Sequence, residues 1–274
     1  MGGVGVEGDR ETYGHEHAVH DAARSLSAND SVTAPSENTG GYHFRMLEHE
    51  GQTYPYTVYV PRALERAEDG TARGLLFLHG YGECGTDGSK PLAVGLPPAM
   101  MLEPERWPFV VVIPQKPTGE AEWEDYAGAV LAMLDAAIEA ERVDPDRVAI
   151  TGLSQGGHGT IQLASMHGDR FCAAAPVCGY VERWWQVGER GRLGFPEGGT
   201  RDAFVRTFEG TPIWLLHGKR DGVVPVGQSE WLHGQLTGAG LASRLTVFPD
   251  DDHNSWDSAY RESGVWEWLV EMTE

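Results

Sequence analysis

The segment at residues 147–157 constrains this chain more than any other. An apolar run there leads into Gly-x-Ser-x-Gly, centred on Ser154, and then into a helical pattern. A turn that sharp would make neighbouring side chains clash, and the flanking glycines remove the clash and tolerate strained backbone angles. The pattern predicts that Ser154 stands as a nucleophile at the carboxyl end of a strand. The alternative is a glycine-rich turn with an incidental serine, since 36 of the 274 residues are glycine.

An acid and a base candidate follow Ser154, each directly after a predicted strand. Asp221 lies in the turn after the apolar run 212–218, and His253 lies in the acidic turn after the run 244–248. The carboxyl ends of parallel strands meet at one edge of a sheet, so the three side chains can converge. An imidazole there can take the serine proton while a carboxylate orients the imidazole.

These residues also have structural interpretations. Asp221 precedes a glycine in a common turn pair, and His253 fits a surface loop. Other candidates for the acid stand next to the histidine: Asp250, Asp251 and Asp252. We favour Asp221 because it follows a strand of its own. Two more histidines near strand ends, His79 and His217, precede glycines, and we interpret them as residues that shape turns.

An oxyanion hole is predicted upstream of the serine. The buried run 75–79 breaks into His-Gly-x-Gly at residues 79–82. Such a loop brings a backbone N–H group close to a substrate carbonyl. The expected donors are the N–H groups of Tyr81 and of Gln155, the residue after the nucleophile.

The hydrophobic period alternates between strands and helices along the chain. We predict strands at 53–60, 74–79, 109–114, 147–151, 171–177, 211–216 and 244–248, and helices at 122–141, 155–166, 227–238 and 257–272. This alternation is typical of an α/β fold, with a mostly parallel central sheet and helices on both faces. The first strands, near 42–60, are expected to form an antiparallel edge.

Several separated segments carry a family resemblance: 78–87, 95–98, 112–115, 143–147, 175–179 and 253–256. In this order they resemble the phospholipase/carboxylesterase and dienelactone-hydrolase-like group of the α/β-hydrolases, which includes feruloyl and acetyl esterases and predicted peptidases. The resemblance covers about residues 42–273. It implies the α/β-hydrolase fold and the triad Ser154, Asp221 and His253. It also implies a pocket near Gln115, Trp123 and Trp256. Dienelactone hydrolases proper use a cysteine nucleophile, so Ser154 points to ordinary ester cleavage.

The composition divides the chain into two regions. Residues 1–41 lack a strand or helix period, and we expect a disordered acidic extension. Residues 42–274 form the predicted catalytic domain. Within it, 180–209 interrupts the alternation, and we expect a lid or pocket wall. Trp184 there either contacts substrate or packs the insertion, and Trp256 either lines the pocket or packs the last helix.

Charge excludes some partners. Asp and Glu number 41 against 21 Lys and Arg, a net charge of −20, which disfavours nucleic acid and anionic membranes. No Sec signal or membrane-spanning run is seen, so we expect a cytoplasmic protein.

We expect no metal and no cofactor. The three cysteines lack zinc spacing, and flexible histidines such as those of the group His15, Glu16, His17 and His20 rarely bind metal tightly.

These features predict a serine carboxylesterase that acts on small esters with a short acyl or an aryl acid group. Long-chain triglycerides are not expected, because the domain has no room for a large lid. A peptidase of the prolyl-oligopeptidase type would use the same triad, although such enzymes usually carry a large gating domain, which we do not expect here. An inactive binding module would have no need to keep the triad.

The acid-rich, lysine-poor composition resembles that of proteins from salt-loving microbes. Acidic surfaces repel themselves in dilute buffer, and salt screens the repulsion. We therefore expect the melting temperature and activity to rise from dilute buffer to molar salt. Thermal unfolding monitored by circular dichroism over that range tests this, and a flat melting temperature would contradict it.

Overall fold

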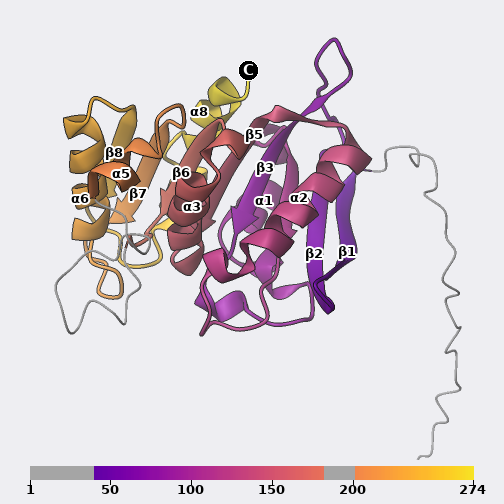
Figure 1. Ribbon diagram of the computed structural model, residues 1–274, viewed down its shortest axis with the longest axis horizontal. Coiled ribbons are helices and arrows are strands. Elements are labelled where there is room, and N and C mark those ends of the chain that lie inside the picture. The colour runs from indigo at the N-terminus through magenta and orange to yellow at the C-terminus, as the bar shows by residue number, and fades with distance from the viewer. Residues whose placement is uncertain (1–39, 182–200) are drawn as a thin grey trace, which may run out of the picture. The chain divides into compact units, whose positions relative to one another are not determined.

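A single eight-stranded sheet organises the part of the chain that the computed structural model describes, residues 40–181 and 201–274 (Figure 1). Its strand order is β1-β2-β4-β3-β5-β6-β7-β8. The strands are β1 (Gly41–His49), β2 (Gln52–Val60), β3 (Ala72–Leu78), β4 (Val110–Pro114), β5 (Val143–Leu153), β6 (Ala173–Val177), β7 (Ile213–Gly218) and β8 (Ser243–Phe248). β1 and β2 pair antiparallel and β2 pairs antiparallel with β4, whereas all pairs from β4 to β8 are parallel. The expected antiparallel edge and parallel body are confirmed.

Helices cover both faces of this sheet. They are α1 (Leu96–Leu102), α2 (Ala127–Glu141), α3 (Gln155–Met166), α5 (Arg201–Arg206), α6 (Gly227–Gly238), α7 (Trp256–Arg261) and α8 (Val265–Met272). Short 3₁₀ turns include η1 (Tyr81–Glu83) and η4 (Trp123–Tyr126). Among the described residues, no helix combines the length and apolar character that a membrane crossing requires.

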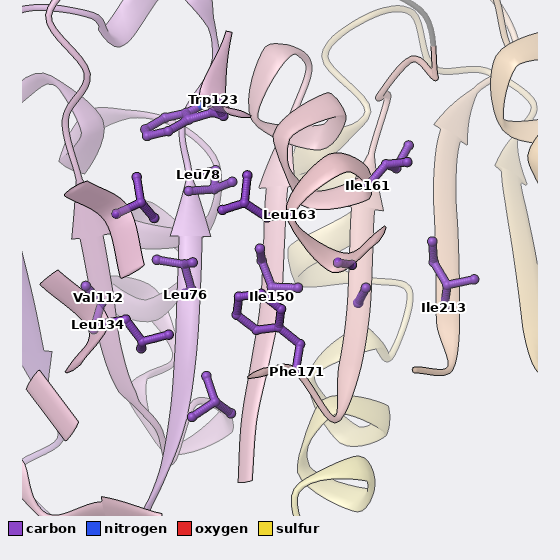
Figure 2. Close-up of a cluster of buried hydrophobic side chains, with 14 of the residues drawn as sticks. Leu76, Leu78, Val112, Trp123, Leu134, Ile150, Ile161, Leu163, Phe171 and Ile213 are labelled. Carbon is purple, nitrogen blue, oxygen red and sulfur yellow. The ribbon is translucent and has the colours of Figure 1, made fainter. Parts of the chain in front are cut away.

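The alternation of side chains along β3 divides the core into two layers. Leu76 and Leu78 point to one face (Figure 2) and belong to a buried cluster that also contains residues of α2, α3, α5 and α6. Leu75 and Phe77 point to the other face and pack with residues of α1, α7 and α8. Because successive strand residues face opposite sides, a continuous apolar run fills both layers.

Three differences between the observed and the expected boundaries have a clear local cause. Helix α1 was not predicted, because Pro97 and Pro98 suggest a loop, but proline is tolerated in a first helical turn. The helix expected over 257–272 is two helices, α7 and α8, separated at Gly264, whose φ of +77° is left-handed. The helix expected from residue 122 begins as the 3₁₀ turn η4.

The junction of β5 with α3 tolerates no side chain at two glycines. A Cβ at Gly156 would lie 1.9 Å from the carbonyl oxygen of Leu78, and a Cβ at Gly152 would lie 2.4 Å from that of Gly156. Both obstacles are backbone atoms, which cannot move aside as a flexible side chain can. The helix therefore begins directly against the ends of β3 and β5.

We expect Gly156→Ala to lower the free energy of unfolding by roughly 3 kcal/mol or more, because the backbone must move to admit one methyl group. The matched control is Gly234→Ala in α6, where a Cβ would meet nothing within 4 Å. That change should raise stability by about 0.5–1 kcal/mol through helix propensity. Urea denaturation of both variants measures the difference, and equal effects would disprove this account.

Candidate active site

Ser154 lies at the turn between β5 and α3 in a strained conformation. Its φ is +54° and its ψ is −115°, which costs a non-glycine residue about 1–3 kcal/mol. Two backbone hydrogen bonds hold the turn: the N–H of Ser154 donates to the carbonyl of Val177 (2.9 Å), and the N–H of His158 donates to that of Ser154 (3.0 Å). The turn is thus tied to the end of β6 as well as to its own helix.

The structure brings Ser154, His253 and Asp221 together. His253 Nε2 lies 2.9 Å from Ser154 Oγ, and His253 Nδ1 lies 2.8 Å from Asp221 Oδ2. A carboxylate only accepts, so Nδ1 carries the imidazole proton and Nε2 is left to accept from the serine hydroxyl. The three residues follow β5, β7 and β8, as expected from the carboxyl ends of parallel strands.

Asp221 is a buried carboxylate with four hydrogen-bond donors. Burial alone would raise its pKa, but side-chain hydrogen bonds from His217 and His253 and backbone bonds from Val224 and Val223 outweigh burial and hold the pKa well below its usual range. Both backbone N–H groups donate to Oδ1 at 2.8 Å. The acid is therefore ionised at neutral pH.

The three neighbouring aspartates do not take this place. Asp250 pairs with Arg220 at the surface, and Asp252 accepts the backbone N–H of Asn254. The carbonyl of Asp251 accepts the backbone N–H of Arg220 (2.8 Å). Their turn packs against the end of β7 and so positions His253 without supplying the acid.

A pocket of about 440 Å³ opens beside the serine. Its lining consists of Tyr81, Gly119, Glu120, Ser154, Gln155, Tyr180, Val223 and Val224. Both predicted oxyanion residues, Tyr81 and Gln155, belong to this lining. The side chain of Gln155 is directed elsewhere, since its amide donates to the carbonyls of Gly119 (2.8 Å) and Ala121 (3.4 Å).

Comparisons with known proteins agree with this architecture. A thermostable esterase superposes with a TM-score of 0.66 and 26% identity over 84% of this chain and 62% of its own. A ferulic acid esterase superposes with a TM-score of 0.62 and 18% identity over 85% of this chain and 98% of its own. The chain has the α/β-hydrolase fold.

Sequence comparisons match only a part of the chain. The model of the Prolyl oligopeptidase family matches residues 115–190. Acylamino-acid-releasing enzyme 2 of Oryza sativa subsp. japonica is 28% identical over 165 residues, which is 50% of this chain and 21% of that enzyme. The chain therefore spans about a fifth of the length of this curated relative.

Two residues expected near substrate lie elsewhere. Gln115 is buried and bridges loops: its amide donates to the carbonyl of Glu83 (2.9 Å), and its Oε1 accepts the N–H of Gly88 (2.6 Å). Trp123 is fully buried and donates its indole N–H to the carbonyl of His79 (3.1 Å). Neither belongs to the lining of the pocket beside Ser154, because each satisfies buried backbone groups behind it.

The two remaining tryptophan candidates have different outcomes. Trp256 begins α7, and its ring lies edge-on to the His253 imidazole, with 5.6 Å between the ring centroids. It therefore packs against the base. It does not belong to the described lining of the pocket. Trp184 lies outside the described residues, as does most of the expected lid. The potential metal group at residues 15–20 also lies outside them.

The loop before Tyr81 depends on a carboxylate that sequence reasoning missed. The Glu83 side chain accepts the N–H of Gly80 (3.0 Å), an N-cap contact three residues apart. That spacing is a capping signal visible in the sequence. The pocket residues Tyr180, Val223 and Val224 carried no such signal, although the two valines closely follow the acid.

A buried polar cluster stands behind Tyr180. The Tyr180 hydroxyl donates to Glu122 Oε1 (2.7 Å), and its ring stacks on His158 at 4.3 Å. His158 Nδ1 donates to the Tyr180 carbonyl (2.7 Å), and Nε2 lies 3.4 Å from Glu124 Oε1. Glu122, Glu124 and His158 bring potential metal-ligand atoms within 4.8 Å of one another. We assign no metal there, because the cationic Lys116 acts on both carboxylates.

His79 supplies a pH-dependent part of the stability. Its Nδ1 donates to the carbonyl of Gly80 (2.6 Å) and its Nε2 accepts the N–H of Lys116 (3.2 Å), so the ring is neutral. Burial lowers its pKa to about 3. Between pH 6.5 and 3 the unfolded chain therefore binds a proton that the folded chain does not, and stability falls as the pH falls through this range.

We expect His79 to account for about 2 kcal/mol of the stability lost between pH 7 and pH 5. In His79→Gln this loss should shrink by that amount, although the variant is less stable at pH 7. Urea denaturation at both pH values measures it, with His49→Gln on the edge strand β1 as the control for removing a histidine. An unchanged difference in His79→Gln would refute the assignment.

Proposed function

We propose that this protein is a serine carboxylesterase that hydrolyses small carboxylic esters through an acyl-enzyme. The observation that carries the proposal is the hydrogen-bonded chain from Ser154 Oγ through His253 to Asp221 at the edge of a pocket. Each distance allows proton transfer or orientation without rearrangement.

The first half of the reaction acylates the serine. Ser154 Oγ attacks the ester carbonyl while His253 Nε2 takes the hydroxyl proton, and Asp221 stabilises the imidazolium. The backbone N–H groups of Tyr81 and Gln155 are proposed to donate to the developing oxyanion, and one such donor is typically worth about 3 kcal/mol. His253 then gives its proton to the leaving alcohol.

The second half releases the acid. Water enters the place of the alcohol, His253 takes one of its protons, and the resulting oxygen nucleophile attacks the acyl carbonyl. Collapse of the second tetrahedral intermediate breaks the bond to Ser154, and His253 returns the proton to Oγ. The proposed reaction requires only these side chains and water.

The pocket supports small, uncharged acyl or aryl groups as substrates. Tyr180 and Val224 form buried apolar walls, and the tyrosine hydroxyl is already bound to Glu122. Among the described residues that line the pocket, Glu120 is the charged one, and it would repel an anionic acyl group. The volume lies within the range usual for small-molecule sites, about 300–1,000 Å³. Two structural relatives are described as esterases.

A peptidase activity is the second candidate. The Prolyl oligopeptidase match over residues 115–190 and the rice acylamino-acid-releasing enzyme favour it. The same triad would cleave an amide, with His253 protonating an amine leaving group. The two activities differ in the leaving group, which is an alcohol for an ester and an amine for an amide.

The test is hydrolysis of p-nitrophenyl acetate, butyrate and octanoate, a feruloyl ester and an acyl-amino-acid p-nitroanilide, from dilute buffer to molar salt. We expect saturable ester turnover with a burst of nitrophenol, because an activated nitrophenyl ester should acylate Ser154 faster than water deacylates it. Ser154→Ala should lower kcat by at least about 10⁴-fold. Turnover of the anilide at a comparable kcat/KM would favour the peptidase.

Ser165→Ala is the matched control. This serine lies buried in α3, donates its hydroxyl to the carbonyl of Gln162, and takes no part in the proposed chemistry. Its activity should equal that of the wild type. If neither ester nor amide is turned over and a fluorophosphonate probe does not label Ser154, the hydrolase proposal fails and a binding module remains.

A further inference from the structure

His217, the residue before the last of β7, makes three contacts inside the protein. Its side chain is fully buried. Nδ1 lies 2.8 Å from Ser229 Oγ of α6, and Nε2 lies 2.9 Å from the carbonyl of Val224 and 3.2 Å from Asp221 Oδ2. A residue that merely shapes a turn has no need to contact the proposed acid.

Chemistry decides which nitrogen carries the proton. The Val224 carbonyl and the ionised Asp221 carboxylate can only accept, so the atom that faces both, Nε2, must donate. Ser229 has a hydroxyl that can donate to Nδ1. The neutral tautomer with its proton on Nε2 fits these contacts, and that single proton is shared between the Val224 carbonyl (2.9 Å) and Asp221 Oδ2 (3.2 Å).

Two imidazoles thus share one carboxylate oxygen. Asp221 Oδ2 accepts from His253 Nδ1 and from His217 Nε2, while Oδ1 accepts from the backbone of Val223 and Val224. A second donor on Oδ2 draws away part of the negative charge that would otherwise act on His253.

We propose that His217 is a positioning residue for the triad: it fixes the orientation of Asp221 and moderates the basicity of His253. The proposal rests on the proposed serine-hydrolase function. It extends that function by adding Ser229 and His217 behind the acid, so that the hydrogen-bonded chain runs from α6 to the nucleophile.

Other ionisable groups also lie near Asp221 and His253. Cys178 brings its sulfur within 4.8 Å of ligand atoms of Asp221 and His253. Burial raises the pKa of this thiol far above its ordinary range, so it stays uncharged. Arg220 pairs with Asp250 and Lys219 with Glu230 at the surface. Asp251 and Asp252 stand in the turn directly before His253, and Asp252 accepts the backbone N–H of Asn254.

The experiment compares His217→Leu and His217→Gln with the wild type. Leucine removes the donor, whereas the glutamine amide can place an N–H group where Nε2 stands. We expect the leucine variant to raise the pKa of His253 by about half a unit to one unit, the size of one moderate hydrogen bond. Its kcat should fall roughly tenfold with KM unchanged, because the acid is less well oriented. The glutamine variant should stay close to the wild type in both.

Two readouts separate this proposal from the proposed function. NMR titration of the His253 imidazole needs no turnover, and the pH profile of kcat/KM reports the same group in the working enzyme. A wild type without any turnover would refute the esterase while the NMR shift still tests His217. No change of the His253 pKa in His217→Leu would overturn the positioning role.

The matched control is His233→Leu, which removes a partly buried histidine of α6 that bonds Ser243 Oγ (3.0 Å). An equal shift of the His253 pKa in this control would mean that His217 acts only through packing. If His217→Leu does not fold, Ser229→Ala provides the second test. Without the Ser229 hydroxyl, the His217 tautomer protonated on Nε2 loses a hydrogen-bond donor to Nδ1. The pKa of His253 should then move upward. No movement would overturn the proposal.

Discussion

The close approach of α3 to the ends of β3 and β5 is the constraint on which the site depends. Only glycine at positions 152 and 156 allows backbone to meet backbone there. That contact forces Ser154 into its left-handed conformation, and its tie to Val177 fixes the turn against β6. The sheet's core thus holds the strain that aims the serine hydroxyl outward.

Hydrogen bonds to the buried Asp221 carboxylate are the second feature on which the site depends. A buried carboxylate is costly unless donors surround it, and Asp221 receives donors from two backbone groups and two imidazoles. The same arrangement fixes the tautomer of His253, whose Nε2 is then free to take the serine proton. Stability of the charge and orientation of the base therefore come from one set of hydrogen bonds.

The apolar character of the pocket depends on polar groups buried behind it. The Tyr180 hydroxyl is bound to Glu122, and the Gln155 amide to carbonyls of the 119–121 loop. Gln115 and Glu83 likewise use their polar atoms to hold backbone. Since these groups are occupied, the surface next to Ser154 is left mainly to aromatic rings and valines, which suits an uncharged acyl group.

The local sequence by itself determined most of the elements and the three triad candidates. Hydrophobic period predicted the limits of α3 and α6, and strand ends placed Ser154, Asp221 and His253 at one edge, because these signals are encoded within a few residues. Tertiary structure alone decided the partners. Gln115 and Trp123 carry polar atoms that suit a pocket or a buried carbonyl equally well, and His217 looked like a turn former. Which group each one meets depends on segments distant in the chain, brought together only when the sheet and its helices pack.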